Sequence, residues 1–429
     1  MRCVMDIQGY RPRILDQAVE EHLSAFGAVC IEGPKWCGKT WTSWKHSNSQ
    51  ILIGDPAGNF QNRRLAQMDP SLILAGETPR LIDEWQEVPG IWDAVRATVD
   101  ARGAKGQFVL TGSSTPQRKG VMHSGAGRIA PLHMRTMTLF ETGDSDGRIS
   151  LHEMFHGTLS PSMTGEVQLP TLAALLVRGG WPGSLDVPAT QAGLLPRRYL
   201  DAILEDGANR MDGIQRDGAK MLRLLRSLAR NESTTVSNRT LRRDIRDVDG
   251  VDISDPTILS YLDVFRRLFL VDDQPPFAPS VRSSVRVKQM AKHHLTDPSL
   301  ACALLGMDAD GLMNDLNTMG FLFEALCEHD LRIYAESFGA KLFHYQDYAE
   351  KEIDAIVELP NDEWGAFEIK LGANQIDAAA EGLLSLRRSI ERDENGRVPK
   401  LLCVLCGMTN AAYTRPDGVM VVPITSLRP

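Results

Sequence analysis

The residues best suited to chemistry lie in a glycine-rich segment near the N-terminus. Its spacing is G-x-x-x-x-G-K-[ST], and its members are Gly33, Pro34, Lys35, Trp36, Cys37, Gly38, Lys39 and Thr40. The glycines let the backbone wrap a phosphate, Lys39 supplies a charge for the β- and γ-phosphates, and Thr40 offers a hydroxyl to Mg²⁺. An apolar run at 27–32 precedes the segment and a helix start follows it, as this motif requires. The sequence therefore predicts a P-loop that binds ATP and Mg²⁺ through these eight residues.

Two adjacent carboxylates follow a second short apolar run. Leu81 and Ile82 lead into Asp83 and Glu84, which is the form of a Walker B strand. In that arrangement Asp83 holds the Mg²⁺ shell together with Thr40, and Glu84 orients and deprotonates the attacking water. The alternative is an acidic pair at a strand end without a catalytic role. The strand–helix pattern between this pair and the P-loop favours the nucleotide site.

Three further positions are candidates for contact with the phosphates or with water. Thr111 and Ser113 follow the next apolar run, so either would act as a sensor of the γ-phosphate or the water; a plain turn is the alternative. Arg128 would stabilise charge on the transferring phosphoryl group, or it is a surface arginine. Whether such an arginine acts within its own chain or from a neighbouring subunit is left open.

A group of bacterial and archaeal AAA-type ATPases, which carry a C-terminal domain of unknown function, resembles this chain. The resemblance is carried by GPKWCGKT at 33–40, LIDEWQ at 81–86, LTGSS at 110–114 and the run 126–141, and it extends over nearly the whole chain. It implies an AAA-like α/β core, ATP binding and a winged-helix-like middle segment. It supplies no settled biological role.

A second constellation of charged residues lies in the C-terminal part. Asp354 begins one apolar run, Glu368 and Lys370 end the next, and Glu324 lies on the preceding helix. This order resembles the PD-(D/E)xK nuclease core, in which Asp354 and Glu368 would bind Mg²⁺, Glu324 would complete the metal shell, and Lys370 would stabilise the attacking water or the developing charge. The alternative is a retained fold used for docking or for binding DNA without cleavage.

The elements around these residues alternate between helix and strand. In the N-terminal part, helices are expected at 11–26 and 91–99, and strands at 27–32, 79–84 and 107–112. Such alternation predicts a parallel sheet with crossover helices, and so an α/β fold class. In the C-terminal part, the expected helices and strands lie at 320–332, 342–345, 353–359, 364–370, 378–392 and 401–405.

The middle segment reads as three helices and a strand, at 218–230, from 237, at 255–270 and at 270–272. This order is compatible with a winged helix, whose third helix would face the major groove of DNA. That helix carries Asp255 and Asp263, with basic residues only at its end, so a module for packing or protein contact is the alternative. The expected domains are an AAA-like P-loop core at 1–145, a helical extension at 146–212, a winged-helix-like module at 213–275 and a nuclease-like domain at 276–429.

Composition sets the class of protein. The 429 residues carry a net charge of −8, yet 210–295 holds sixteen Lys and Arg against eleven Asp and Glu, which permits a segment that faces nucleic acid.

Cys403 and Cys406 form a CxxC pair without a matching second pair, so buried strand cysteines are favoured over zinc. No apolar signal segment or run of about 20 apolar residues is seen, so a cytoplasmic protein without a membrane span is expected.

Histidines are not assigned a role. His46, His293 and His294 stand in polar stretches and are expected at the surface, and His123 is expected in a loop.

Together these features predict a Mg²⁺-dependent ATPase whose nucleotide state controls the winged-helix and nuclease-like modules. The expected partners are ATP and either double-stranded DNA or a protein, with homo-oligomers open because AAA-type relatives often form rings. One alternative is a Mg²⁺-dependent DNA nuclease regulated by ATP. The other is a nucleotide-gated protein-interaction switch with little catalysis.

Overall fold

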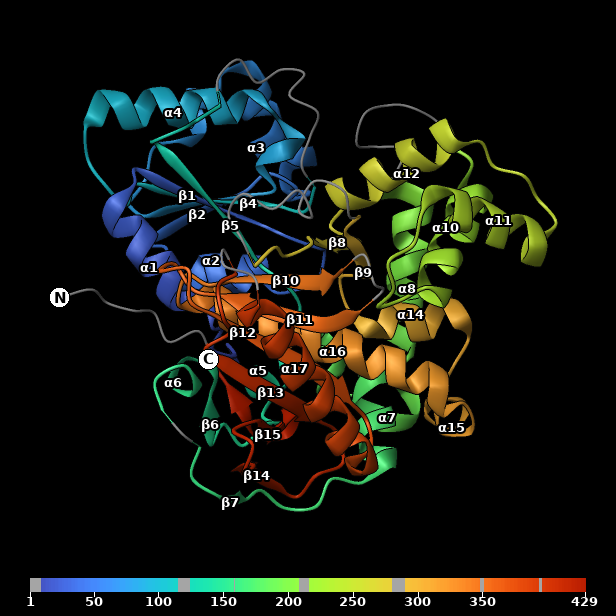
Figure 1. The fold of residues 1–429 in the computed structure, drawn as a ribbon. Helices are drawn as coiled ribbons and strands as arrows, with labels where there is room; N and C mark the ends of the chain where they lie inside the picture. Colours follow the sequence, from blue (N-terminus) through green and yellow to red (C-terminus); the bar gives the residue numbers. More distant parts are fainter. Residues whose placement is uncertain are drawn as a thin grey trace. The chain divides into compact units, whose positions relative to one another are not determined.

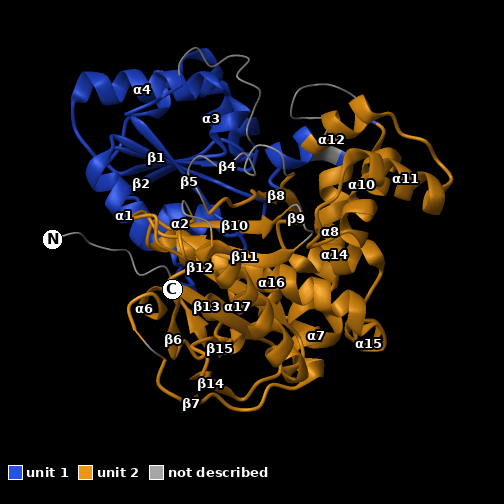
Figure 2. Ribbon diagram, in the orientation of Figure 1, with its two compact units in different colours: residues 1–136, 205–216, 263–270 blue, residues 137–204, 217–262, 271–429 orange. Residues whose placement is uncertain are grey.

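The computed structural model describes residues 9–114, 124–157, 159–207, 216–279, 290–347, 351–392 and 396–429. The chain divides into two compact units, drawn in different colours in Figure 2. Unit 1 contains 1–136, 205–216 and 263–270, and unit 2 contains 137–204, 217–262 and 271–429. His123, expected in a loop, lies outside the described residues.

Unit 1 is built on a five-stranded parallel sheet with the order β2-β3-β4-β1-β5 (Figure 1). Its strands are β1 (Ala28–Glu32), β2 (Ser49–Leu52), β3 (Arg80–Asp83), β4 (Phe108–Gly112) and β5 (Ile129–His133). Its helices are α1 (Leu15–Ala25), α2 (Lys39–Lys45), α3 (Ala57–Met68), α4 (Gly90–Arg102) and the 3₁₀ turns η1 (Pro70–Ile73) and η2 (Trp85–Glu87). The predicted α/β class with a parallel sheet is confirmed for this part of the chain.

Both faces of this sheet are covered, as parallel sheets require. Ala28 and Cys30 of β1 pack in the core that α3 and α4 cover, whereas Val29 and Ile31 point to the opposite core beneath α1 (Figure 1). Successive side chains of a strand point to opposite faces, so a continuous apolar run such as 28–31 serves both cores. The predicted strands at 27–32, 79–84 and 107–112 are β1, β3 and β4, while β2 and β5 were not predicted.

Unit 2 contains a seven-stranded mixed sheet with the order β10-β11-β12-β13-β15-β14-β7. Its strands are β7 (Ser162–Met163), β10 (Lys341–Gln346), β11 (Glu352–Glu358), β12 (Trp364–Lys370), β13 (Leu401–Cys406), β14 (Ala411–Thr414) and β15 (Met420–Pro423). Strands β10, β11 and β12 pair antiparallel, whereas β13 pairs parallel to both β12 and β15. Helix α17 (Ile376–Glu391) crosses between β12 and β13 and buries its apolar face, including Leu383 and Leu386, on the sheet.

The remaining elements of unit 2 are mainly helical. They are β6 (Ile149–Ser150), β8 (Val271–Gln274), β9 (Lys292–Leu295), β16 (Leu427–Arg428), α5 (Leu139–Thr142), α6 (Leu151–Met154), α7 (Leu169–Arg178), α8 (Leu194–Ala202), α10 (Gly218–Arg230), α11 (Asn238–Asp249), α12 (Asp255–Arg267), α14 (Pro298–Leu305), α15 (Ala309–Asn314), α16 (Leu316–Ser337), η3 (Pro182–Ser184), η4 (Ala189–Gln191), η5 (Ile203–Gly207), η6 (Ala373–Gln375) and η7 (Ile424–Ser426); η5 and α12 each run across the division between the units. Strands β8 and β9 pair antiparallel, and β6 pairs parallel to β16. Within the described ranges, no helix combines the length and apolarity needed to cross a membrane.

Side-chain caps fix the ends of the middle helices. Asp217 accepts a hydrogen bond from the Lys220 backbone N–H at the start of α10, and Ser237 accepts one from Thr240 at the start of α11. Gly250 ends α11 in the left-handed conformation, which glycine adopts without a steric penalty. Two of the three predicted helices of this segment, α10 and α11, are therefore marked by local signals.

The GGWPG turn at 179–183 is held by contacts on every side. Gly179 has φ +67°, the Gly180 backbone N–H donates to Asp297 Oδ2 at 2.9 Å, and the fully buried Trp181 donates from Nε1 to Ser299 Oγ at 2.9 Å. A Cβ on Gly180 would lie 1.9 Å from the Met137 carbonyl oxygen. The turn is thus a packing feature of unit 2.

Gly180→Ala is expected to lower the free energy of unfolding by roughly 1–3 kcal/mol, the usual cost of overpacking. The added methyl would meet a backbone oxygen that cannot move aside independently. Chemical denaturation measures the change. Gly157→Ala is the matched control, because no heavy atom lies within 4 Å of its added Cβ. Equal stability of the two variants would contradict the expectation.

Candidate nucleotide-binding site

The glycine-rich segment forms a tight loop between β1 and α2. Gly38 has φ +105°, a conformation that residues with a side chain rarely adopt. A Cβ on Gly33 would lie 2.0 Å from the Met134 carbonyl oxygen, so the segment after β5 approaches the loop too closely for any other residue. Trp36 also has a positive φ, +65°. The two glycines of the motif are therefore required by the shape of the loop.

Lys39 is 5% exposed and its ammonium is held within the loop. The Nζ atom donates to the carbonyl oxygens of Gly33 at 2.9 Å and Pro34 at 2.7 Å. Lys39 is the residue that the motif predicts to contact the β- and γ-phosphates, and in the structure two carbonyl oxygens of the loop hold its charge.

Arg13, which was not predicted from the sequence, holds the loop at Cys37. Its Nη1 donates to the Cys37 carbonyl oxygen at 2.8 Å, and its Nη2 donates to the Arg135 carbonyl oxygen at 2.8 Å. The side chain is 8% exposed. An arginine ahead of the first helix carries no motif, so only the tertiary structure shows its contact with the loop.

Asp83 joins the loop to the neighbouring strands. Its Oδ1 accepts hydrogen bonds from Thr40 Oγ1 at 3.0 Å and from Thr111 Oγ1 at 2.7 Å. Burial raises the pKa of Asp83, and the bond from Thr111 opposes the rise. A hydroxyl and a carboxylate side by side are the hard oxygen donors that Mg²⁺ prefers, so Thr40 and Asp83 fit the metal role predicted for them.

Glu84 lies beside this group with a left-handed backbone, φ +58°. Its N–H donates to Thr111 Oγ1 at 2.9 Å, and its Oε2 accepts from Ser113 Oγ at 2.9 Å and from Gln86 Nε2. Both sensor candidates, Thr111 and Ser113, therefore contact the acidic pair. Gln86 was missed, although it stands two residues after Glu84 in the sequence.

Arg128 does not join this group, and its predicted role within the same chain needs correction. Its carbonyl oxygen accepts from the Ala28 N–H at 3.0 Å, which places it at the start of β1, whereas the P-loop follows the end of that strand. The five residues of β1 put its two ends about 13 Å apart. The guanidinium instead donates from Nε to Asp100 Oδ1 at 2.8 Å.

The second constellation is partly assembled on β11 and β12. Asp354 Oδ2 accepts from the Ile369 N–H at 2.7 Å and from Lys370 Nζ at 3.1 Å, and Lys370 Nζ lies 2.7 Å from Glu368 Oε2. Burial, followed by the charge of Asp354, raises the pKa of Glu368 to about 7. Three of the four predicted residues therefore form one ion-pair group.

Glu324, the fourth residue, pairs with a lysine that the sequence did not suggest. Lys292 on β9 is fully buried, and its Nζ lies 3.0 Å from Glu324 Oε1, 3.3 Å from Glu352 Oε1 and 3.6 Å from Glu328 Oε1. Burial alone would lower the pKa of Lys292, but the charges of Glu328 and Glu324 raise it well above its ordinary value. An internal ammonium thus compensates the carboxylate that was expected to bind Mg²⁺. Among the described residues, no group of three or more His, Cys, Asp or Glu is arranged to hold a metal ion.

The expected surface positions of the histidines are wrong. His294 is 7% exposed, with Nδ1 3.0 Å from Glu232 Oε1 and Nε2 2.9 Å from Gln274 Oε1, and burial lowers its pKa well below the ordinary value. His293 contacts Asp273 Oδ1 at 2.7 Å, and the His46 side chain is 5% exposed beside Asp16. The described cysteines are free and buried, with Cys403 and Cys406 on β13.

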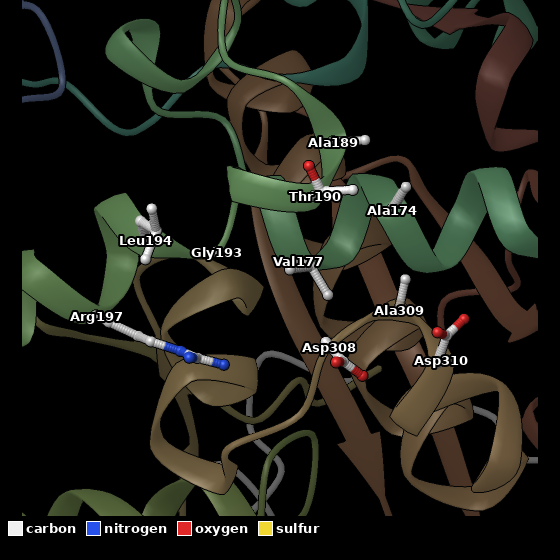
Figure 3. Close-up of a pocket in the computed structure, with 10 residues that line it drawn as sticks. All are labelled: Ala174, Val177, Ala189, Thr190, Gly193, Leu194, Arg197, Asp308, Ala309 and Asp310. Carbon is white, nitrogen blue, oxygen red and sulfur yellow. The ribbon is translucent and has the colours of Figure 1, made fainter.

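Unit 2 has cavities near its helices and beside its sheet. One, of 470 Å³, is lined by residues that include Val177, Arg197 and Asp308 and holds none of the predicted site residues (Figure 3). The other, of 590 Å³, is lined in part by Glu324 and Lys370. The second cavity therefore opens beside the charged group of β11 and β12.

Comparison with known families gives three matches along the chain. Residues 25–143 match an AAA domain, residues 169–311 match a domain of unknown function (DUF8612), and residues 319–427 match a domain of unknown function (DUF4143). The first match, with the loop geometry, confirms the expectation of an AAA-type P-loop core in the N-terminal part.

The chain is also similar to individual proteins. An uncharacterized protein of Mycobacterium bovis and one of Mycobacterium tuberculosis are each 26% identical over 352 residues, which cover 80% of this chain and 70% of the relative. The Walker-type ATPase of Pyrococcus abyssi is 14% identical with a TM-score of 0.43, covering 71% of this chain and 99% of that chain. The replication initiator DnaA bound to AMPPCP and single-stranded DNA is 12% identical with a TM-score of 0.25, covering 59% and 86%.

Lys292→Met is expected to destabilise the protein by roughly 3–5 kcal/mol near pH 8, because it leaves buried carboxylates uncompensated. Burial raises the pKa of Glu328 to about 7, so the folded state binds more protons there than the unfolded state, and stability falls as pH rises through this range. The difference from the unaltered protein should therefore be smaller at pH 5 than at pH 8.

Thermal and urea unfolding at both pH values measure this difference. Lys220→Met, at an exposed position on α10, is the control for loss of a lysine charge. A Lys292→Met protein as stable as the unaltered protein at both pH values would contradict the assigned ion pairs.

Proposed function

We propose that the protein is a Mg²⁺-dependent ATPase that binds the nucleotide at Gly33–Thr40. The observation that carries this proposal is the shared contact of Thr40 and Thr111 with Asp83 Oδ1, directly beside Glu84. It joins the loop, the acidic strand end and the next strand end in one polar group. The match of residues 25–143 to an AAA domain supports the same reading.

Each residue of the proposed site has its own role in binding or hydrolysis. The loop backbone and Lys39 bind the phosphates, while Thr40 and Asp83 would hold Mg²⁺, which supplies charge neutralisation of the phosphates when bound. Glu84 accepts the proton of the attacking water, and its carboxylate is oriented by Ser113 and Gln86. Thr111 fixes the position of Glu84 through its bond to the backbone N–H.

Glu84→Gln is expected to keep ATP binding and to lose at least about 100-fold in the rate of hydrolysis, because the amide cannot accept the proton of the water. Phosphate release measures turnover, and titration with labelled ATP measures binding. Lys39→Ala should instead lose binding itself.

Glu87→Gln is the matched control, since Glu87 stands three residues away in an exposed ion pair with Arg63. Hydrolysis by Glu84→Gln at the rate of the control would remove Glu84 from the mechanism. Tight ATP binding by the unaltered protein without turnover would favour the nucleotide-gated switch.

We propose that the middle segment is a winged-helix-like module that contacts protein. Three helices, α10 to α12, are followed by the antiparallel pair of β8 and β9, in the order of that motif. Two of its arginines are held in short ion pairs: Arg230 contacts Asp244 at 2.7 Å, and Arg242 contacts Asp252 at 2.7 Å. Paired arginines offer less charge to DNA phosphates, which favours a protein partner.

A second candidate function is Mg²⁺-dependent cleavage of DNA, controlled by the nucleotide. The observation that favours it is the grouping of Asp354, Glu368 and Lys370 on two neighbouring strands beside a cavity of 590 Å³. The order α16, β10, β11, β12, α17 and β13 places a helix before a strand meander and another after it. The pairing of Glu324 with Lys292 weighs against a complete metal shell.

If this function holds, Glu368→Gln will abolish Mg²⁺-dependent cutting of double-stranded DNA, because the amide loses the charge that binds the metal. Gel analysis of cutting, with and without ATP, is the measurement. Glu363→Gln, in an exposed turn, is the control. No cutting by the unaltered protein would leave the C-terminal domain as a docking module.

A further inference from the structure

Three large indoles are exposed around the P-loop. Trp36 at the loop, and Trp41 and Trp44 on α2, are 50%, 46% and 36% exposed. Trp41 and Trp44 are three residues apart, so they lie on one side of the helix, and their ring centroids are 6.1 Å apart. An exposed group of aromatic side chains on a short helix is a mark of a binding surface.

The other sides of α2 are already covered. Thr42 and Ser43 are fully buried, and Thr42 Oγ1 lies 3.1 Å from the Tyr10 hydroxyl. The Lys45 ammonium lies 4.7 Å from the centre of the Tyr10 ring. The N-terminal segment therefore packs on the face of Thr42 and Lys45, and the face of Trp41 and Trp44 is left for another contact.

If Gly33–Thr40 binds the phosphates as proposed, the order of the loop residues favours this face as the nucleoside end of the ligand. Asp83 and Glu84 act on the γ-phosphate, so that end of the triphosphate lies on their side of Thr40. The α-phosphate and the nucleoside lie at the other end, outside this buried acidic group. Trp41 follows Thr40 directly in the chain and is 46% exposed, so its indole is available to a nucleoside that leaves the loop on the exposed side.

Trp36 adds an independent observation at the same place. Its φ of +65° is in the left-handed region, which is strained for a bulky residue and which Gly or Asn would adopt more easily. A half-exposed tryptophan held in this conformation lies at the loop itself. Such backbone outliers cluster at ligand sites.

We propose that Trp41, supported by Trp44, forms a stacking face for the base of the bound nucleoside triphosphate. This inference rests on the proposed nucleotide-binding function and adds the part of the ligand that the phosphate-binding motif does not address. Indole is a suitable partner because stacking needs only a planar, weakly polar ring and leaves the indole edge in contact with water. Stacking between a base and an aromatic side chain is sequence-tolerant, so the face recognises a base without selecting one.

The test compares ATP with inorganic triphosphate, both with Mg²⁺, because the second probe has the phosphates but no base. Trp41→Ala is expected to weaken ATP binding about fivefold to a hundredfold and to leave triphosphate binding unchanged. Trp41→Phe keeps a ring and should retain most of the ATP affinity. Met68→Ala, at a residue 79% exposed in the same unit, is the control for loss of exposed apolar surface.

Isothermal titration gives both dissociation constants for each variant. Unchanged ATP affinity in Trp41→Ala would overturn the stacking face. Equal weakening for ATP and triphosphate would also overturn it, since the substitution would then act through the loop. Failure of the unaltered protein to bind either probe would instead refute the proposed nucleotide-binding function.

Discussion

The carboxylate of Asp83 is the contact on which the arrangement of the nucleotide site depends. It lies at the end of β3 and accepts hydrogen bonds from Thr40, at the start of α2, and from Thr111, at the end of β4. Because β3, β4 and β1 are neighbours in a parallel sheet, their carboxyl ends meet at one edge, and a single acidic group can join all three. Thr111 Oγ1 also accepts a hydrogen bond from the backbone N–H of Glu84 and so holds that residue beside Asp83. The positions of Asp83, Glu84 and the loop are therefore set by one short series of hydrogen bonds.

Much of this site could be predicted from the sequence because its signals are local. The P-loop and the acidic strand end each occupy a few consecutive residues, and the alternation of helix and strand predicts the parallel sheet that brings them together. Arg13 and Gln86 were missed for different reasons. Arg13 contacts residues far away in the chain, so no residue spacing in the sequence predicts these contacts. Gln86 is close to Glu84 in the sequence, but an amide in a turn has no pattern of its own. For Arg128 the surface alternative fits the structure, since its exposed side chain pairs with Asp100 just ahead of β5, a strand that was not predicted.

Unit 2 illustrates a different difficulty. The strands that carry Asp354, Glu368 and Lys370 have clear apolar runs, and their pairing follows from order and length. The charge balance does not, because Lys292 comes from β9, beside His293 and His294, in a polar stretch that was expected at the surface. A lysine is usually exposed, and only the fold reveals that this one is buried among three carboxylates. The same stretch hides His294, whose two ring nitrogens contact Glu232 and Gln274.

The contacts of Arg13 have a consequence for shortened forms of the chain. One guanidinium joins the stretch ahead of α1 to the loop at Cys37 and to Arg135 after β5, which is 122 positions away in sequence. A fragment that began at α1 would keep every residue of the nucleotide motif and the whole parallel sheet. It would still lose the hydrogen bond from Arg13 to the Cys37 carbonyl oxygen, whereas the contacts of Lys39 with Gly33 and Pro34 and of Cys37 Sγ with Met134 would remain. A fragment whose ends are chosen from the motif or from the sheet alone would therefore lack one of the contacts that hold the loop.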